Sequence, residues 1–213
     1  MLCNAEVKLV GKKLKNPKHT EAVRRKTMAT KEMGKLGLSL EDDLVSIGFV
    51  FSHLSTSHLN YLGLTSINKF CEEYTGVDIC LFSQHITPPC LTPLCPVFGM
   101  SDLLKWHRYP LITTSIGTTI EAIFTNAPVI YHYVFDPEFI GKPHYESCDL
   151  KLAFCDPRVR VIIRHESHKE LIEKEFDIRV CDIIVPDCDV EILAKFVLTE
   201  MKNGNEKTTH QNG

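Results

Sequence analysis

The sequence has no apolar run that approaches the roughly 20 residues needed to span a membrane. Its N-terminus also lacks the apolar stretch, between a basic start and a small-residue cleavage site, that marks a secretory signal. Three motifs are absent as well: the phosphate-binding P-loop, the glycine-rich nicotinamide fingerprint and the Ser-His-Asp order. These absences predict a soluble cytoplasmic protein without a membrane partner, and they argue against three common classes of enzyme.

Nine cysteines are present, but the odd number and their positions argue against a disulfide framework. Cys80, Cys155 and Cys181 lie in the apolar, strand-like runs VDICLF, LAFCD and RVCDIIV. Cysteines in such runs are typically buried and reduced. The close pair Cys90 and Cys95 does not have zinc-knuckle spacing and has no second pair near it. We therefore expect free thiols and no metal site.

The net charge of −3 conceals a strong asymmetry along the 213 residues. Residues 1–40 contain ten basic and three acidic side chains, whereas residues 41–213 contain fourteen basic and twenty-four acidic ones. This split predicts a basic arm (1–40), a single globular domain (41–203) and a polar, disordered tail (204–213). The arm has two interpretations, which are a nucleic-acid-binding segment and a solvated surface.

From Leu44 onward, short β-branched runs alternate with longer segments of helical spacing. This alternation predicts an α/β fold with a Rossmann-like, doubly wound and mostly parallel sheet. Strands are predicted at 44–51, 77–82, 110–115, 127–134, 159–164 and 180–187, and helices in the regions 58–70, 101–107, 115–124, 166–176 and 188–203.

In such a sheet, ligands bind in the loops that follow the carboxyl ends of the strands. Those loops are 52–57, 113–119, 133–139 and 164–167. The second one reads Thr-Thr-Ser-Ile-Gly-Thr-Thr, and its small and hydroxylated residues would let an anion approach the start of the next helix. The alternative is an ordinary Ser cap, with Glu121 as a partly exposed helix carboxylate.

The run TSIGTTIEAIFTNAPVI (114–130) resembles the donor-binding segment in the C-terminal half of GT-B glycosyltransferases. In that family a strand ends, a small Ser/Gly/Thr turn opens a helix, a glutamate follows and Pro-Val-Ile begins the next strand. Thr118, Glu121, Ala122 and residues 128–130 match this pattern. A weaker similarity covers residues 44–200, so the domain resembles one half of a GT-B enzyme.

The resemblance implies a nucleotide-sugar donor and no tightly bound cofactor. It places Ser115, Gly117 and Thr118 at the diphosphate and Glu121 at the ribose hydroxyls. Further contacts to the sugar or diphosphate are expected from the strand-end residues Asp136, Glu138 and Arg164, and His53 is a candidate base. Because the family builds its active site between two such domains, a homodimer or a second subunit would complete it.

The segment 11–31 resembles the small nuclease-associated DNA-binding motif of phage-type homing endonucleases, with Lys-His-Thr-Glu opening a short basic helix. No nuclease catalytic constellation accompanies it. The residues expected to contact phosphates are Lys18, Arg24, Arg25, Lys26 and Lys31. Together the two resemblances predict a phage or bacterial glycosyltransferase that modifies DNA or a DNA-associated acceptor. The alternative is a non-catalytic module that binds nucleic acid or protein.

The arm generates the first testable prediction. Duplex DNA binding should fall steeply with salt, and removing any one of Arg24, Arg25, Lys26 and Lys31 should lower the log–log slope by roughly 0.9. Deleting residues 1–40 should abolish this binding without unfolding the domain, as measured by salt-dependent fluorescence anisotropy and circular dichroism. Equal DNA affinity with and without the arm would show that its charge is only a solvated surface.

Overall fold

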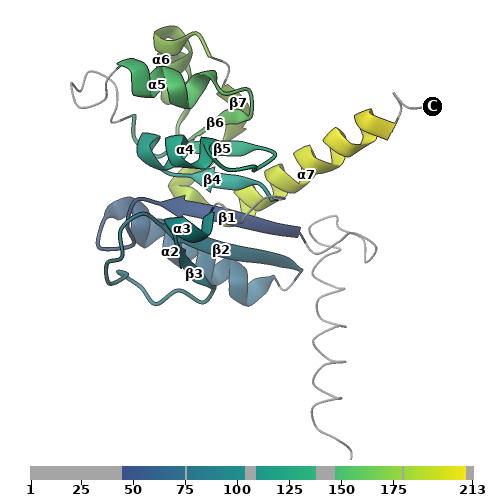
Figure 1. Ribbon diagram of the computed structural model, residues 1–213. Helices are drawn as coiled ribbons and strands as arrows, with labels where there is room; N and C mark the ends of the chain where they lie inside the picture. Colours follow the sequence, from purple (N-terminus) through teal and green to yellow (C-terminus); the bar gives the residue numbers. More distant parts are fainter. Residues whose placement is uncertain (1–44, 75, 104–108, 138–146, 179, 210–213) are drawn as a thin grey trace, which may run out of the picture.

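The computed structural model describes residues 45–74, 76–103, 109–137, 147–178 and 180–209. Strands and helices alternate along this part of the chain, except that the second and third strands follow one another without a helix between them (Figure 1). The strands are β1 (Val45–Phe51), β2 (Val77–Ser83), β3 (Val97–Gly99), β4 (Leu111–Thr113), β5 (Ile130–Val134), β6 (Val159–Ile163) and β7 (Val180–Ile184). The helices are α2 (His58–Glu73), α3 (Met100–Leu103), α4 (Ile116–Ile123), α5 (Ser147–Cys155), α6 (Glu166–Phe176), the 3-10 turn η1 (Pro186–Cys188) and α7 (Val190–Thr209).

The seven strands of the described residues join one parallel sheet in the order β3-β2-β1-β4-β5-β6-β7. The chain moves outward from β1 to β2 and β3, returns to β4 on the other side of β1, and then moves outward in the opposite direction. Val50 of β1 accordingly pairs with Phe82 of β2 on one edge and with Thr113 of β4 on the other. The predicted Rossmann-like, doubly wound sheet is confirmed, and its switch point lies between β1 and β4.

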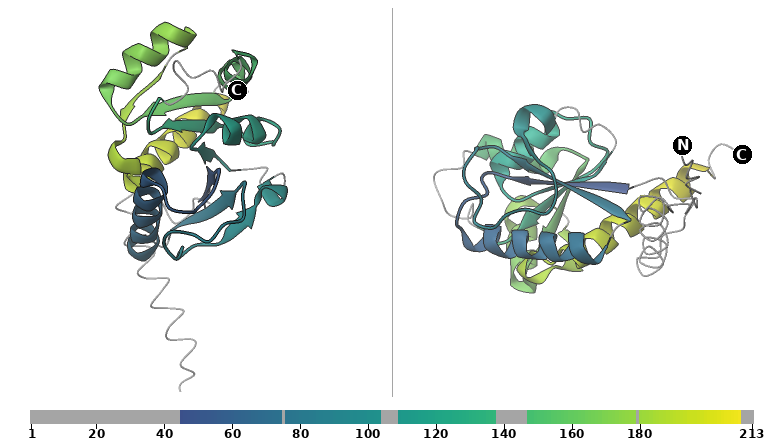
Figure 2. Two further views of the ribbon diagram at one scale, coloured as in Figure 1. Left: turned by 90° about the vertical axis from the view of Figure 1, so that its left-hand side faces the viewer. Right: turned by 90° about the horizontal axis from the view of Figure 1, so that it is seen from below.

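Helices α2 and α7 cover one face of the sheet and lie side by side (Figure 2). Ile47, Phe49 and Phe51 are completely buried beneath them, as expected for alternate residues of a strand. A Cβ at Gly63 of α2 would stand 3.2 Å from Cζ of Phe51. The missing side chain therefore allows α2 to lie directly on β1.

The opposite face is covered by α3, α4, α5 and α6, whose buried side chains form two adjoining clusters with the strands. Val50 of β1 points to this face and packs in the same cluster as Ala122 of α4. Helices α2 and α4 thus lie on opposite faces, and both begin at the carboxyl edge of the sheet. Their N-termini therefore approach the switch point from two sides.

The structure differs from the sequence-based expectations in three elements. Residues 152–155, which resemble a strand in sequence, belong to α5. The short edge strand β3 was not predicted, because the prolines beside it obscure the pattern. Helix α7 extends to Thr209, beyond the expected end at residue 203.

The basic arm, including Lys18, Arg24, Arg25, Lys26 and Lys31, lies outside the described residues, as does Glu138. Within the described residues, all seven cysteines whose side chains are placed are free thiols. No helix in this part of the chain combines the length and apolar character required to cross a membrane.

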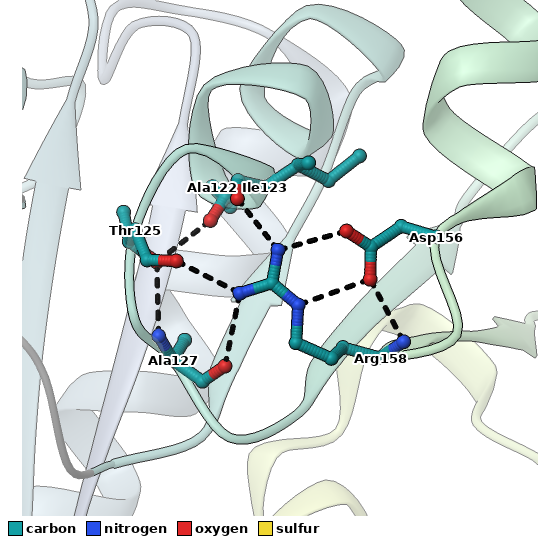
Figure 3. Close-up of polar contacts among 6 residues, drawn as sticks. All are labelled: Ala122, Ile123, Thr125, Ala127, Asp156 and Arg158. Atoms are coloured by element: carbon teal, nitrogen blue, oxygen red, sulfur yellow. Dashed lines mark hydrogen bonds and ion pairs between the residues drawn. The ribbon is translucent and has the colours of Figure 1, made fainter.

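A partly buried arginine clamps the carboxyl end of α4 (Figure 3). The Arg158 guanidinium donates to the carbonyls of Ile123 at 2.6 Å, Thr125 at 2.8 Å and Ala127 at 3.4 Å. It also donates to both carboxylate oxygens of Asp156, at 3.0 and 2.8 Å. This hydrogen bonding lowers the pKa of the Asp156 carboxyl. The clamp satisfies carbonyls that a helix end leaves without intrahelical partners, and it ties α4 to β6.

This clamp leads to a stability prediction. Replacing Arg158 with Ala should lower the free energy of unfolding by about 2 kcal/mol, because several carbonyls and one carboxylate lose their donor together. Arg160→Ala is the matched control, since that arginine lies close by in the sequence but forms a more exposed ion pair with Glu200. The control should cost less than about 1 kcal/mol in urea denaturation. Equal losses in the two variants would show that Arg158 contributes no more than a surface pair.

Candidate functional site

A pocket of about 310 Å³ opens at the carboxyl edge of the sheet, at the switch point between β1 and β4. Its wall is built from the segments that follow β1 and β4, from the first turns of α2 and α4, and from the end of β5. The loop after β1 and the first turn of α2 contribute Ser52, His53, Ser57 and Asn60. The segment after β4 contributes Ser115, and β5 with the residues that follow it contributes His132, Phe135 and Asp136.

Two serine-capped helix starts meet in this wall. Ser57 caps α2 by accepting a hydrogen bond from the backbone N–H of Asn60 at 3.1 Å. Ser115 caps α4 through a capping box, in which its hydroxyl accepts from the Thr118 N–H and the Thr118 hydroxyl accepts from the Ser115 N–H. Each cap satisfies only one of the first backbone N–H groups of its helix. Both helices therefore direct partial positive charge toward the same pocket.

His53 forms the part of the wall that follows β1. Its Nδ1 lies 2.8 Å from the Ser55 hydroxyl and 3.0 Å from the side-chain amide nitrogen of Asn60. Asn60 is only 3% exposed, and its amide nitrogen also donates to the Ser55 carbonyl at 2.7 Å. The imidazole ring is therefore held on one edge by a buried amide.

A chain of buried polar groups lies beneath the start of α4. The Thr119 hydroxyl donates to the Ser115 carbonyl at 2.9 Å. The same hydroxyl oxygen lies 2.6 Å from the Thr113 hydroxyl and 2.8 Å from Nδ1 of His132. His132 is 2% exposed, and its ring packs edge-on against Phe154. Burial lowers its pKa to about 4, so the ring is neutral at physiological pH. This network links β4, α4 and β5 at the pocket floor.

Asp136 is the only carboxylate among the pocket-lining residues of the described chain. Arg164 stands next to it, with a distance of 3.8 Å between Nη1 and the Asp136 carboxylate. The guanidinium also lies 4.0 Å from the ring centroid of Phe135 and donates to Asp187 at 2.7 Å. Arg164 does not line the pocket, but it contacts two residues that do.

Of the residues predicted from sequence, His53, Ser115 and Asp136 line the pocket. Thr118 is buried in the capping box, and a Cβ at Gly117 would meet open space. Glu121 lies one turn further along α4, where its carboxylate accepts a hydrogen bond from Gln84 at 2.6 Å. Gln84 follows β2, and its backbone N–H donates to the Phe51 carbonyl. Gln84 and Glu121 therefore lie on the same edge of the sheet as the pocket but outside its wall.

Sequence reasoning missed Asn60 and His132. Asn60 lies in the first turn of an apolar helix, and His132 lies in the apolar strand run APVIYHYV. A polar residue in a completely buried strand is a usable signal, because such a residue needs a partner.

No cluster of three or more His, Cys, Asp or Glu side chains suited to a metal ion occurs in the described part of the chain.

The buried His132 leads to a pH prediction. Its pKa is about 4 in the folded protein, whereas the ordinary value of 6.5 applies to the unfolded chain. Between pH 4 and pH 6.5, the unfolded chain therefore binds a proton that the folded chain does not. Its contribution to stability is therefore complete above pH 6.5 and decreases as the pH falls toward 4, by about 3 kcal/mol in total.

The measurement is urea denaturation at several pH values for wild type and His132→Gln. The variant should show a smaller decrease in the free energy of unfolding across this window. His85→Gln is the control, because that ring is exposed, and it should behave as wild type. Parallel curves for wild type and His132→Gln would contradict the prediction.

No protein-family model, curated protein or solved structure matches this chain. The resemblances of residues 44–200 and 11–31 to known families therefore stay predictions, and the pocket geometry is the principal basis for assigning a function.

Proposed function

We propose that the pocket binds the diphosphate of a nucleotide, and that a nucleotide sugar is the leading candidate for the ligand. One observation carries this proposal: the serine-capped starts of α2 and α4 open on one pocket at the switch point of a doubly wound sheet. This is the position at which such sheets bind nucleotides. Helix starts suit phosphates because they supply backbone donors and the positive end of a dipole.

The electrostatics of the wall support an anionic ligand whose charge is bound mainly by backbone donors. Asp136 is paired with Arg164, and His132 is neutral at physiological pH. The remaining polar groups include hydroxyls and imidazoles, which can donate to phosphoryl oxygens. A diphosphate therefore meets donors without needing a metal ion to neutralise opposing carboxylates.

The pocket volume of about 310 Å³ lies at the small end of the range for ligand sites. The pocket holds the diphosphate and the donor sugar attached to it, while the nucleoside, with its ribose, extends along the edge of the sheet. Glu121 lies on that edge, held by Gln84. A carboxylate there can accept hydrogen bonds from two ribose hydroxyls, in agreement with the role that the glycosyltransferase resemblance implies.

Sugar transfer requires an acceptor site in addition to this donor site. A homodimer or a second subunit would supply this acceptor site. The basic arm suggests that the acceptor is DNA. A module that binds the nucleotide without transferring the sugar is the alternative. Product analysis with a radiolabelled nucleotide sugar and duplex DNA separates the two, because only a transferase labels the DNA.

The binding prediction is tested by calorimetry with uridine, guanosine and cytidine diphosphates. At least one of them should bind wild type. Ser52→Phe should abolish that binding, because Ser52 lines the pocket and a benzyl group would fill it. Thr56→Phe is the matched control: it introduces the same ring in place of another small hydroxylated residue of the same loop, at an exposed position outside the pocket wall. Equal binding by both variants would place the ligand elsewhere.

In the same titration, Glu121→Ala should weaken binding by about 1–3 kcal/mol, because the ribose hydroxyls lose a charged acceptor. Gln84→Ala removes the partner of Glu121 and leaves the carboxylate in place, so it should bind nearly as wild type does. If none of the three nucleotides binds wild type at millimolar concentration, the proposed function is wrong.

A further inference from the structure

The orientation of the Asn60 amide determines which nitrogen of His53 carries the proton. The Asn60 nitrogen Nδ2 lies 2.7 Å from the backbone carbonyl oxygen of Ser55. A carbonyl can only accept, so the amide group at this position must be the NH₂ and not the oxygen. Because Asn60 is 3% exposed, water does not compete for this contact.

The same Nδ2 lies 3.0 Å from Nδ1 of His53, so its second hydrogen is available for that nitrogen. An amide nitrogen donates and does not accept. A proton on Nδ1 would therefore point at another N–H, whereas an unprotonated Nδ1 accepts from it. The Ser55 hydroxyl lies 2.8 Å from Nδ1 and can donate to the same lone pair.

The neutral ring consequently carries its proton on Nε2, on the edge turned away from Asn60. No hydrogen bond joins this nitrogen to any residue in the described part of the chain. His53 lines the pocket that Ser57 and Ser115 also border. The Nε2–H group of His53 therefore adds a side-chain donor to the backbone donors at the starts of α2 and α4.

We infer that His53 presents a fixed Nε2–H donor to an oxygen of the bound ligand, held in this tautomer by Asn60, and that it is not the base of a reaction in this pocket. The ligand part of this inference rests on the proposed function, and a phosphoryl oxygen of the diphosphate is the acceptor. In this arrangement His53 binds the ligand and Asn60 is a positioning residue. A base would need an unprotonated Nε2, which places the proton on Nδ1 against the Asn60 amide.

The tautomer is tested without any ligand, by NMR of the full chain labelled with ¹⁵N in its histidine rings. His53→Gln assigns the resonances by their loss. The expected result for the neutral ring is a proton on Nε2 and none on Nδ1. A neutral ring with its proton on Nδ1 would overturn the inference whatever the protein binds.

Asn60→Asp tests the positioning role. A carboxylate only accepts, so Nδ1 should gain a proton in this variant, whether the ring is neutral or charged. An Nδ1 that stays without a proton would overturn the role assigned to Asn60. If this buried variant does not fold, Ser55→Ala serves in its place; it keeps the Ser55 carbonyl and the Asn60 contact, and it should keep the proton on Nε2. A proton on Nδ1 in Ser55→Ala would equally overturn that role.

The ligand contact is tested by calorimetry with the same three nucleoside diphosphates. His53→Ala should bind about tenfold or more weakly, as expected for the loss of a hydrogen bond to a charged group. His53→Gln should bind within about threefold of wild type, because its amide can donate from nearly the position of Nε2 but cannot take up a proton. Wild-type affinity in His53→Ala would overturn the contact. Absence of binding by wild type would overturn the proposed function and this contact together, while the NMR result still decides the tautomer.

Discussion

The pairing of β1 with both β2 and β4 is the constraint on which the site depends. β1 lies inside the sheet, with hydrogen-bonded neighbours on both edges. Since parallel neighbours need a crossover, and crossovers have a fixed hand, the helix after β1 and the helix after β4 must cover opposite faces. The crevice between the ends of these two strands is then bordered by two helix starts. The pocket is a consequence of the strand order.

The same constraint would allow a protein with a net charge of −3 to bind the proposed anionic ligand. The donors in the pocket wall are chiefly backbone groups at helix starts, together with hydroxyls and imidazoles, and they carry little formal charge. Arg164 stands next to the wall, between Asp136 and Asp187, so its charge is already shared. If the pocket binds a diphosphate as proposed, recognition would depend on the positions of these dipoles, and therefore on the rigidity of the elements that hold them.

The fold could be predicted from sequence because its buried strands are continuous β-branched runs with clear turn signals between them. The exceptions have physical reasons. β3 is a three-residue, partly exposed edge strand, and α5 contains the apolar run LAFC, which has no periodicity that distinguishes a helix from a strand. The pocket wall was predictable at His53, Ser115 and Asp136, because all three lie in loops that follow strands visible in the sequence. The contact between Asn60 and His53 was not, since it depends on how the loop after β1 folds back on α2. The pairing of Glu121 with Gln84 joins residues 37 positions apart, and no local pattern indicates it.

Helix α4 shows how the structure holds a short helix in place at both ends. It has eight residues, too few to be stable alone. Its N-terminus is held by the Ser115 capping box and by the Thr119 contacts to Thr113 and His132. At the other end, the Arg158 clamp places a cation at the negative end of the helix dipole. The unpaired backbone N–H groups of α4 lie in its first turn, at the pocket, while Arg158 binds carbonyls at the opposite end. A ligand anion there and Arg158 at the far end would therefore stabilise the same helix through the same dipole.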